Sequence, residues 1–325
     1  MESWKAMVLG TDAVILMLVL FAAPQERWSA NAGAAILVVT CMTAILVFGI
    51  PSIKMQLTVK SEHALAIVLA IPYLAVFITG GSGIKQFPTF AIWYILPAIL
   101  MWISGKLENS TLSSLSLIGG AAMLWIGFDH RYTRELFEGY SDSYLFNSLW
   151  MAAVGLVACQ GRILTNHSFD NGIFPTKQGA KIANIVTPIA SLIIVPFGLL
   201  TGFLEWNPQI EVTGIFIGFI GIFLTISLQE ELIFRGITLR ELDLMAHQTT
   251  NPNFWKRMSL ITISILFALT HWNNETKQYV FHYFFAAFIA GVAYGIAYRK
   301  GGMFGAMLSH TLVDWVWALL LKRVE

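Results

Sequence analysis

Long runs of apolar residues recur along the whole chain and are separated by short polar connections. Most runs approach the roughly 20 residues that an α-helix needs to cross a bilayer, and we count about eleven of them. Because they are continuous rather than alternating, they predict helices and not the strands of a barrel. The sequence therefore predicts an all-α, polytopic membrane bundle of about 10–11 transmembrane helices. The runs cover residues 6–23, 33–50, 64–80, 89–105, 112–128, 144–159, 184–204, 213–236, 258–272, 279–298 and 303–321.

Composition agrees with this pattern and excludes several classes of protein. Of the 325 residues, 56% are hydrophobic and only 12% are charged, whereas about a quarter of an average soluble domain is charged. A soluble globular domain and a disordered chain are therefore excluded. The net charge of +1 gives no basic field for binding nucleic acid. Cys41 and Cys159 lie inside apolar runs, so we interpret both as small hydrophobic residues.

The distribution of Lys and Arg predicts how the chain is oriented. With about eleven spans, most of these residues fall in connections on the side that holds Lys5, so we place the N-terminus in the cytoplasm. The first run resembles a signal peptide, but Asp12 interrupts it and residues 24–27 separate it from the Ala30-Asn31-Ala32 site. We therefore expect an uncleaved first helix.

Charged residues inside a membrane span are costly, and they gather in the C-terminal third. Glu230, Glu231 and Arg235 directly follow an apolar run. On one helix Glu231 and Arg235 are four apart with the acid first, which favours an ion pair. Glu230 points about 100° away and is left without a partner at that spacing. The alternative is that the cluster forms the water-exposed end of a helix.

Two further pairs of residues have the same spacing of four. Phe267 and His271 share a face near the end of one run, and His310 and Asp314 share a face inside another. In isolation, His271 is equally compatible with a helix–helix hydrogen bond, and His310 with a structural pair. His282 has no matched partner, so we interpret it as a packing residue.

The three clusters are expected to lie at a similar depth in the membrane. Counted from the nearest cytoplasmic helix end at 1.5 Å per residue, Glu230 and His271 lie about 20 Å deep and His310 somewhat less. Small residues in these runs would allow the helices to approach closely. These small residues are Gly214, Gly218, Gly291 and Gly295.

In order and spacing these clusters resemble the CPBP family of intramembrane glutamic proteases, which includes the prenyl-protein (CAAX) endopeptidases. The family pattern is Glu-Glu-x-x-x-Arg, then Phe-x-x-x-His, then His-x-x-x-Asn or a similar polar residue. The resemblance covers about residues 213–321. We therefore expect a protease core over 183–325 and accessory transmembrane helices over 1–182.

The resemblance implies roles for the clustered residues. Glu230 would be the base that activates a water molecule, and His271 would help to hold that water. His310 would stabilise the oxyanion. Asp314 stands where Asn is usual, and an ionised Asp only accepts hydrogen bonds. Asp314 is therefore either protonated or serves to orient and charge His310, and we favour the second. The implied site residues are Glu230, Glu231, Arg235, His271, His310 and Asp314.

The resemblance also implies a membrane-anchored or lipidated protein as substrate, cut near its membrane end, in what we expect is a prokaryotic cell membrane. The expected partners are that substrate and the lipid bilayer, with no nucleic acid and no cofactor. A zinc protease using Glu230, His271, His310 and Asp314 is the nearest alternative, although the His-Glu-x-x-His signature is absent. A serine protease using Ser82, a proton-coupled transporter and a non-enzymatic scaffold or immunity protein are further alternatives.

Overall fold

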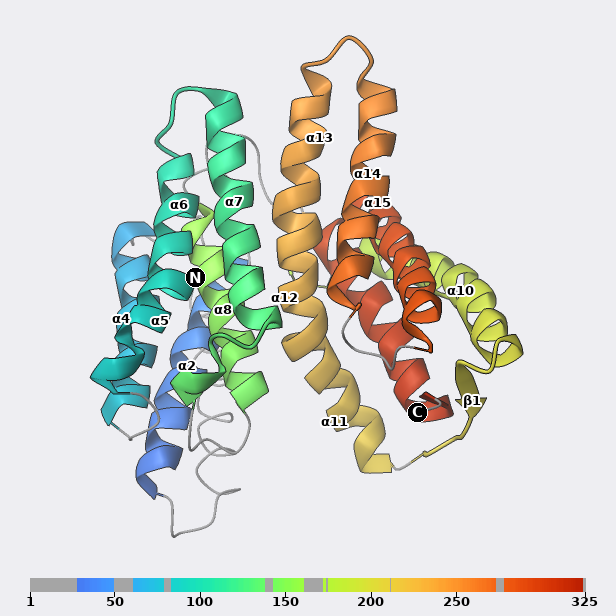
Figure 1. Ribbon diagram of the computed structural model, residues 1–325, viewed down its shortest axis with the longest axis horizontal. Helices are drawn as coiled ribbons and strands as arrows, with labels where there is room; N and C mark the ends of the chain where they lie inside the picture. The colour runs from blue at the N-terminus through green and yellow to red at the C-terminus, as the bar shows by residue number, and fades with distance from the viewer. Residues whose placement is uncertain are drawn as a thin grey trace. The chain divides into compact units, whose positions relative to one another are not determined.

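A computed structural model describes residues 28–49, 61–78, 83–137, 143–160, 172–173, 175–210, 212–272 and 278–323. These residues are almost entirely helical (Figure 1). The chain divides into two compact units, Met1–Ser168 and Phe169–Glu325. The division precedes the expected boundary at residues 182 and 183, which falls inside a helix of the second unit. Two features of the sequence lie outside the described residues: the first predicted run, which contains Asp12, and Ser82.

The first unit is a group of apolar helices around the buried helix α8. Trp150 of α8 stacks on Tyr94, with ring centroids 4.3 Å apart, and its indole N–H donates to the Val68 carbonyl oxygen over 2.8 Å. Cys41 and Cys159 are buried free thiols, as expected. The elements are α2 (Trp28–Gly49), α4 (Ser61–Ile78), η2 (Ile84–Gln86), α5 (Phe87–Phe90), η3 (Ala91–Ile95), α6 (Leu96–Ser104), α7 (Ser110–Asp129), η4 (Arg134–Phe137) and α8 (Ser143–Ala158).

The second unit holds all six residues of the predicted site, and one long helical stretch in it changes between α and π geometry. Between Val212 and His247 the chain remains helical through five consecutive elements. The unit comprises α10 (Lys177–Leu200), β1 (Leu204–Trp206), α11 (Val212–Ile222), η5 (Phe223–Ser227), α12 (Leu228–Glu231), η6 (Leu232–Leu239), α13 (Arg240–His247), α14 (Pro252–Thr270), α15 (Val280–Leu320) and β2 (Leu321–Arg323).

The predicted polytopic helical class is confirmed. Among the described residues, six helical stretches are long and apolar enough to cross a membrane, and two more apolar helices are shorter. The predicted number of 10–11 is larger, partly because the run 6–23 is not described and because α14 is not among the six. The six stretches are 32–49, 84–104, 110–129, 177–200, 215–247 and 280–320.

The longest of these stretches, α15, is two helices that fold back on each other at Gly302. Gly302 has φ 72° and ψ −169°, which no helix contains. The rings of Tyr294 and His310 stack with centroids 4.5 Å apart, whereas 16 residues of straight helix would separate them by about 24 Å. The chain therefore reverses here, as the two separate apolar runs 279–298 and 303–321 predicted.

Small residues allow close helix packing, although not at every predicted position. A Cβ added at Gly291 would lie 3.2 Å from Ser264, and one added at Gly295 would lie 2.2 Å from Leu260, so both predictions are confirmed. Gly218 has open space around it, and the prediction for this residue was wrong. The side-chain surroundings of Gly214 lie outside the described residues. Other close contacts join α10 to α15, at Gly179, Gly301 and Gly305.

The conformation of Gly302 predicts a specific cost for adding a side chain. Replacing Gly302 by Ala forces an L-residue into a region that only glycine adopts easily, which costs about 1–3 kcal/mol. We expect Gly302→Ala to lower the midpoint of thermal unfolding in detergent. Gly218→Ala, in a helix of the same unit with open space around it, is the matched control and should not lower it. Equal midpoints for the two variants would contradict this reading of the turn.

Candidate active site

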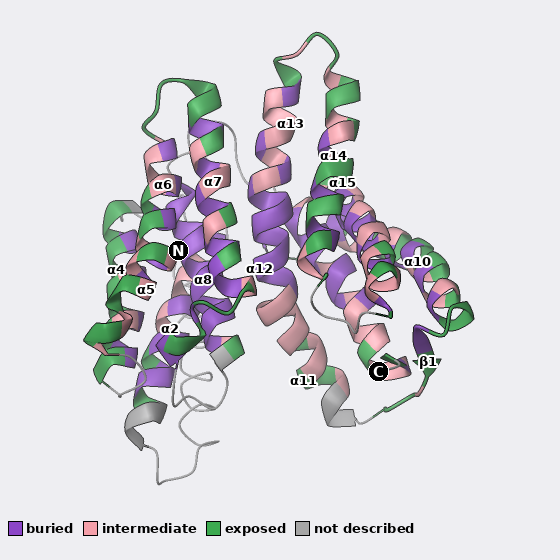
Figure 2. Cartoon of the chain, in the orientation of Figure 1, coloured by how far each residue is buried: buried purple, intermediate pink, exposed green. Residues whose placement is uncertain are grey.

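The helix that carries the paired glutamates is distorted on both sides of them. Only one turn, α12, is α-helical, and the π-helical segments η5 and η6 flank it. Every residue of α12 is buried, and so is most of η6 (Figure 2). Wide helical turns of this kind are rare and often accompany functional sites, because they redirect the side chains around them.

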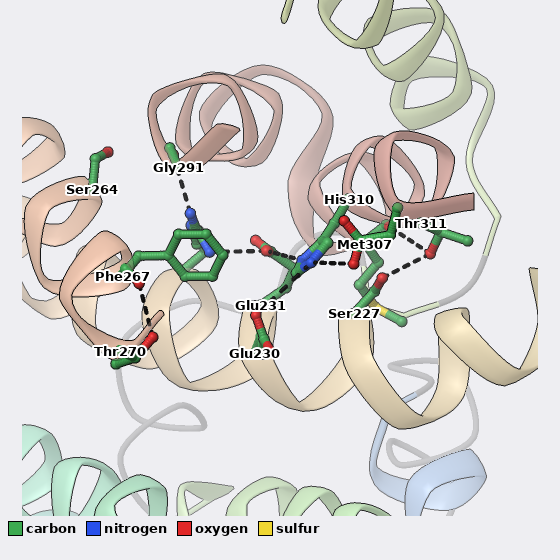
Figure 3. A network of polar contacts seen from close by, with 12 residues as sticks. Ser227, Glu230, Glu231, Ser264, Phe267, Thr270, Gly291, Met307, His310 and Thr311 are labelled. Carbon is green, nitrogen blue, oxygen red and sulfur yellow. Dashed lines mark hydrogen bonds and ion pairs between the residues drawn. The ribbon is translucent and has the colours of Figure 1, made fainter. Parts of the chain in front are cut away.

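In the interior of the second unit, the Glu231 carboxylate binds both the Arg235 guanidinium and the His310 imidazole. Its Oε1 atom accepts hydrogen bonds from Arg235 Nη1 and from His310 Nδ1, each over 2.8 Å. Arg235 Nη2 also donates to the Gly291 carbonyl oxygen over 3.1 Å, and the guanidinium carbon lies 4.4 Å from the centre of the Phe267 ring. Figure 3 shows these contacts. They run from the Gly291 backbone of α15 through Arg235 and Glu231 to His310, which lies in the second half of α15. The predicted Glu231–Arg235 ion pair is confirmed, and the structure adds His310 to it.

Aromatic and acidic side chains surround the His310 ring. Its flat face stacks on Tyr294 at an angle of 15°, and the edge of Phe267 approaches it at 5.9 Å. Nε2 lies 3.3 Å from Asp314 Oδ2 and 3.8 Å from Glu230 Oε2. Because Nδ1 donates to Glu231, a neutral ring would present a lone pair at Nε2 to two carboxyl oxygens. This arrangement is favourable only when a proton lies on Nε2 or on one of the two carboxyl groups.

The two adjacent glutamates have different surroundings. Glu231 is fully buried and bound on one oxygen by Arg235 and His310. Glu230 is 7% exposed, and within the described part of the chain neither its Oε2 nor the Oε2 of Glu231 has a hydrogen-bond partner. A buried polar atom without a partner is uncommon and calls for a functional or structural reason. The sequence predicted this division: Glu231 pairs with Arg235, and Glu230 faces elsewhere.

His271 follows the last residue of α14, and a backbone contact sets its tautomer. Its Nδ1 lies 2.8 Å from the Phe267 carbonyl oxygen. A carbonyl oxygen only accepts, so Nδ1 carries the hydrogen, and in the neutral ring Nε2 carries a lone pair. Its ring packs against Phe267 at 4.7 Å, as the spacing of four predicted, and against Tyr283 at 5.4 Å.

A cavity of about 320 Å³ lies beside this cluster, and neither Glu230 nor Glu231 is among its lining residues. Its walls are mostly apolar, and His271, His310 and Asp314 contribute polar atoms to it. Asp314 is the most open of the three clustered carboxyl groups, with 35% of its side chain exposed. Mostly apolar walls with a few converging polar groups are typical of ligand sites. The lining residues are Ile194, Ile222, Ile226, Phe267, His271, Tyr283, Ala286, Ala287, Ala290, Tyr294, His310, Val313, Asp314, Trp317, Ala318 and Arg323.

Sequence reasoning missed Tyr294 and the bond between Glu231 and His310. Both depend on the reversal of α15 at Gly302, and no spacing along the sequence encodes that contact. The interpretation of His282 as a packing residue is confirmed, because its ring lies among Phe197, Phe203 and Tyr279. Across the described residues, no group of three or more His, Cys, Asp or Glu side chains is placed to hold a metal ion.

The buried ion pair predicts a large, coupled effect on stability. Arg235→Met leaves the Glu231 carboxylate buried without its cation, which should cost about 3–5 kcal/mol of unfolding free energy. Glu231→Gln combined with Arg235→Met removes both charges and should be less destabilised than the sum of the two single variants. The measurement is denaturation of the purified protein in detergent.

The partly exposed pair Arg299–Asp243 provides the matched control. Arg299→Met should cost less than Arg235→Met, because both partners of this pair retain some contact with solvent. Strictly additive effects of Glu231→Gln and Arg235→Met would show that the buried groups are not coupled.

Comparison with known proteins gives one match. Residues 212–316 match a family model described as Type II CAAX prenyl endopeptidase Rce1-like. The match covers about a third of the chain and includes all six predicted site residues. Searches of curated proteins and of solved structures found no match. The family model supports a peptide hydrolase with a membrane-anchored protein substrate, and the helices support a multi-pass membrane protein. The predicted resemblance is confirmed over residues 212–316, which match the Rce1-like family model of type II CAAX prenyl endopeptidases.

Proposed function

We propose that this protein is an intramembrane endopeptidase that cuts a membrane-anchored or lipidated protein near its membrane end, using water activated by Glu230. One observation carries the mechanism. A buried carboxyl oxygen of Glu230 lacks a hydrogen-bond partner in the described residues and lies 3.8 Å from His310, a ring that lines the cavity. The proposed partners are that substrate and the lipid bilayer, and the cytoplasmic position of the N-terminus stays a prediction.

In the first step Glu230 acts as general base. A water molecule bound between Glu230 and His271 gives one proton to the Glu230 carboxylate as its oxygen attacks the carbonyl carbon of the peptide bond. Nε2 of His271 accepts a hydrogen bond from the second hydrogen of the water, which its Nδ1 bond to Phe267 makes possible. The carbonyl π electrons move onto oxygen and form an oxyanion.

His310 stabilises that oxyanion. With Nδ1 held by Glu231, a proton on Nε2 points into the space shared by Glu230 and Asp314. A fixed N–H donor in a dry cavity stabilises developing negative charge strongly, since it needs no reorganisation during the reaction. Asp314 keeps His310 charged and oriented, and His310 alone donates. Collapse of the oxyanion breaks the C–N bond, and protonated Glu230 returns the proton to the leaving amine.

The base role of Glu230 predicts loss of cleavage without loss of the fold. Glu230→Gln keeps the shape of the side chain but cannot take a proton, and we expect the rate to fall by about 100-fold or more. The measurement is release of the C-terminal peptide from a farnesylated CAAX peptide by purified protein, followed by mass spectrometry. Glu205→Gln changes an exposed carboxylate on β1 that does not line the cavity, so it should cleave at the wild-type rate.

The same assay tests the alternative mechanisms. Full cleavage by Glu230→Gln would contradict the mechanism. The proposed reaction needs no cofactor, so a chelator should leave the rate unchanged, and loss of activity that zinc restores would favour the zinc alternative. Loss of activity in Ser82→Ala, with Glu230→Gln active, would favour a serine protease.

The role of Asp314 is tested by two substitutions at that position. Asp314→Asn places the residue of the family pattern there, and its amide can donate to the oxyanion, so we expect activity to be kept. Asp314→Ala removes both the orienting carboxylate and any replacement donor and should lower kcat by about tenfold or more. If Asp314→Asn were as inactive as Asp314→Ala, the carboxylate itself would be required, which would contradict this assignment.

A further inference from the structure

The cavity wall includes a tyrosine whose hydroxyl the proposed reaction does not use. Tyr294 of α15 lines the cavity and is 1% exposed. None of the hydrogen bonds among the described residues involves its hydroxyl. A buried tyrosine normally bonds its O–H to a neighbouring group, and an exception calls for a reason. A free donor at a cavity wall is suited to bind what enters the cavity.

The Tyr294 ring is packed against the ring that is proposed to stabilise the oxyanion. It stacks on His310 with the centroids 4.5 Å apart and an angle of 15° between the ring planes. Phe267 approaches it edge-on at 6.1 Å, and the guanidinium carbon of Arg235 lies 5.4 Å from its centre. These neighbours fix the plane of the Tyr294 ring, so its hydroxyl keeps one position relative to His310.

The backbone that carries Tyr294 is held in place by close helix packing. Gly291 and Gly295 flank it on α15, and a Cβ added at these glycines would lie 3.2 Å and 2.2 Å from atoms of α14. The Gly291 carbonyl oxygen also accepts a hydrogen bond from Arg235 Nη2 over 3.1 Å. This part of α15 therefore cannot rotate about its axis without a clash or a broken bond, and Tyr294 stays in the cavity wall.

The chemistry of the site leaves room for another donor to the oxyanion. Of the pair His310 and Asp314, only His310 donates, because an ionised carboxylate only accepts. The Asn of the family pattern has an amide that could supply a second bond, and Asp314 takes its position in this chain. Tyrosine hydroxyls are among the side-chain donors that stabilise such oxyanions. Tyr294 lines the same cavity as His310 and Asp314, so its O–H is available for this role.

We propose that the Tyr294 hydroxyl donates a second hydrogen bond to the oxyanion, beside the bond from His310 Nε2, and so supplies the donor that Asp314 cannot. The phenol keeps its proton throughout. Its hydrogen bond strengthens as the carbonyl π electrons move onto oxygen and weakens when they return and the C–N bond breaks. Tyr294 is thereby a catalytic residue. This proposal rests on the proposed function and adds a donor to it.

The first test removes the hydroxyl and keeps the ring stack. Tyr294→Phe in the full-length protein should lower kcat for the farnesylated CAAX peptide by about 10- to 100-fold. KM should change little, because the lost bond forms only in the transition state. Tyr298→Phe makes the same change one turn further along α15, outside the cavity lining, and should cleave at the wild-type rate. A wild-type kcat in Tyr294→Phe would overturn the proposal.

The second test asks whether the hydroxyl serves the oxyanion or only the packing. In the Asp314→Asn background the Asn amide supplies a donor, so adding Tyr294→Phe should lower kcat by no more than about threefold. An equal loss of kcat in both backgrounds would show that the hydroxyl acts elsewhere and would overturn the proposal. The wild-type protein keeps the two hypotheses apart: if it does not cleave the peptide, the proposed function itself is contradicted.

Discussion

The buried carboxylate of Glu231 holds the candidate site together. It accepts from Arg235 on its own helix and from His310 on α15, each over 2.8 Å. A charge in an apolar interior is tolerated only when it is paired and hydrogen-bonded, so these three side chains have few alternative arrangements. Arg235 extends the constraint, because it also bonds the Gly291 backbone of the other half of α15. The interaction thus links η6 to both halves of the last helical hairpin.

This constraint explains why two neighbouring glutamates have different surroundings. Both arise from one turn of helix, and the Oε2 atom of each has no hydrogen-bond partner in the described residues; they differ because Oε1 of Glu231 accepts from two donors, whereas Oε2 of Glu230 lies 3.8 Å from His310 Nε2. Glu230 lies beside Nε2 of the ring that Glu231 holds at Nδ1, on an α-helical turn flanked by π-helical segments. A structural acid and a candidate catalytic acid are therefore adjacent in sequence and are joined through one imidazole.

The geometry of the cavity follows from chain reversals more than from helix faces. The turn at Gly302 brings Tyr294 against His310, and the small sheet after Leu320 brings Arg323 to the same cavity. Mostly apolar walls with a few converging polar groups are typical of a ligand site. The first unit supplies none of the candidate residues, and its own polar contacts, such as the Trp150 bond to Val68, are internal to it.

The sequence by itself determined the helical membrane class, the Glu231–Arg235 pair, the Phe267–His271 contact and the His310–Asp314 pair. Each of these follows from local rules, namely a run long enough to cross a bilayer or a spacing of four on one helix. Tertiary structure alone decided the bond from Glu231 to His310, the stack of Tyr294 on His310, the open surroundings of Gly218 and the arrival of Arg323 at the cavity. The physical reason is that helix periodicity fixes only neighbours within one helix. Contacts between residues far apart in the chain depend on where the backbone reverses and on which buried charges must meet.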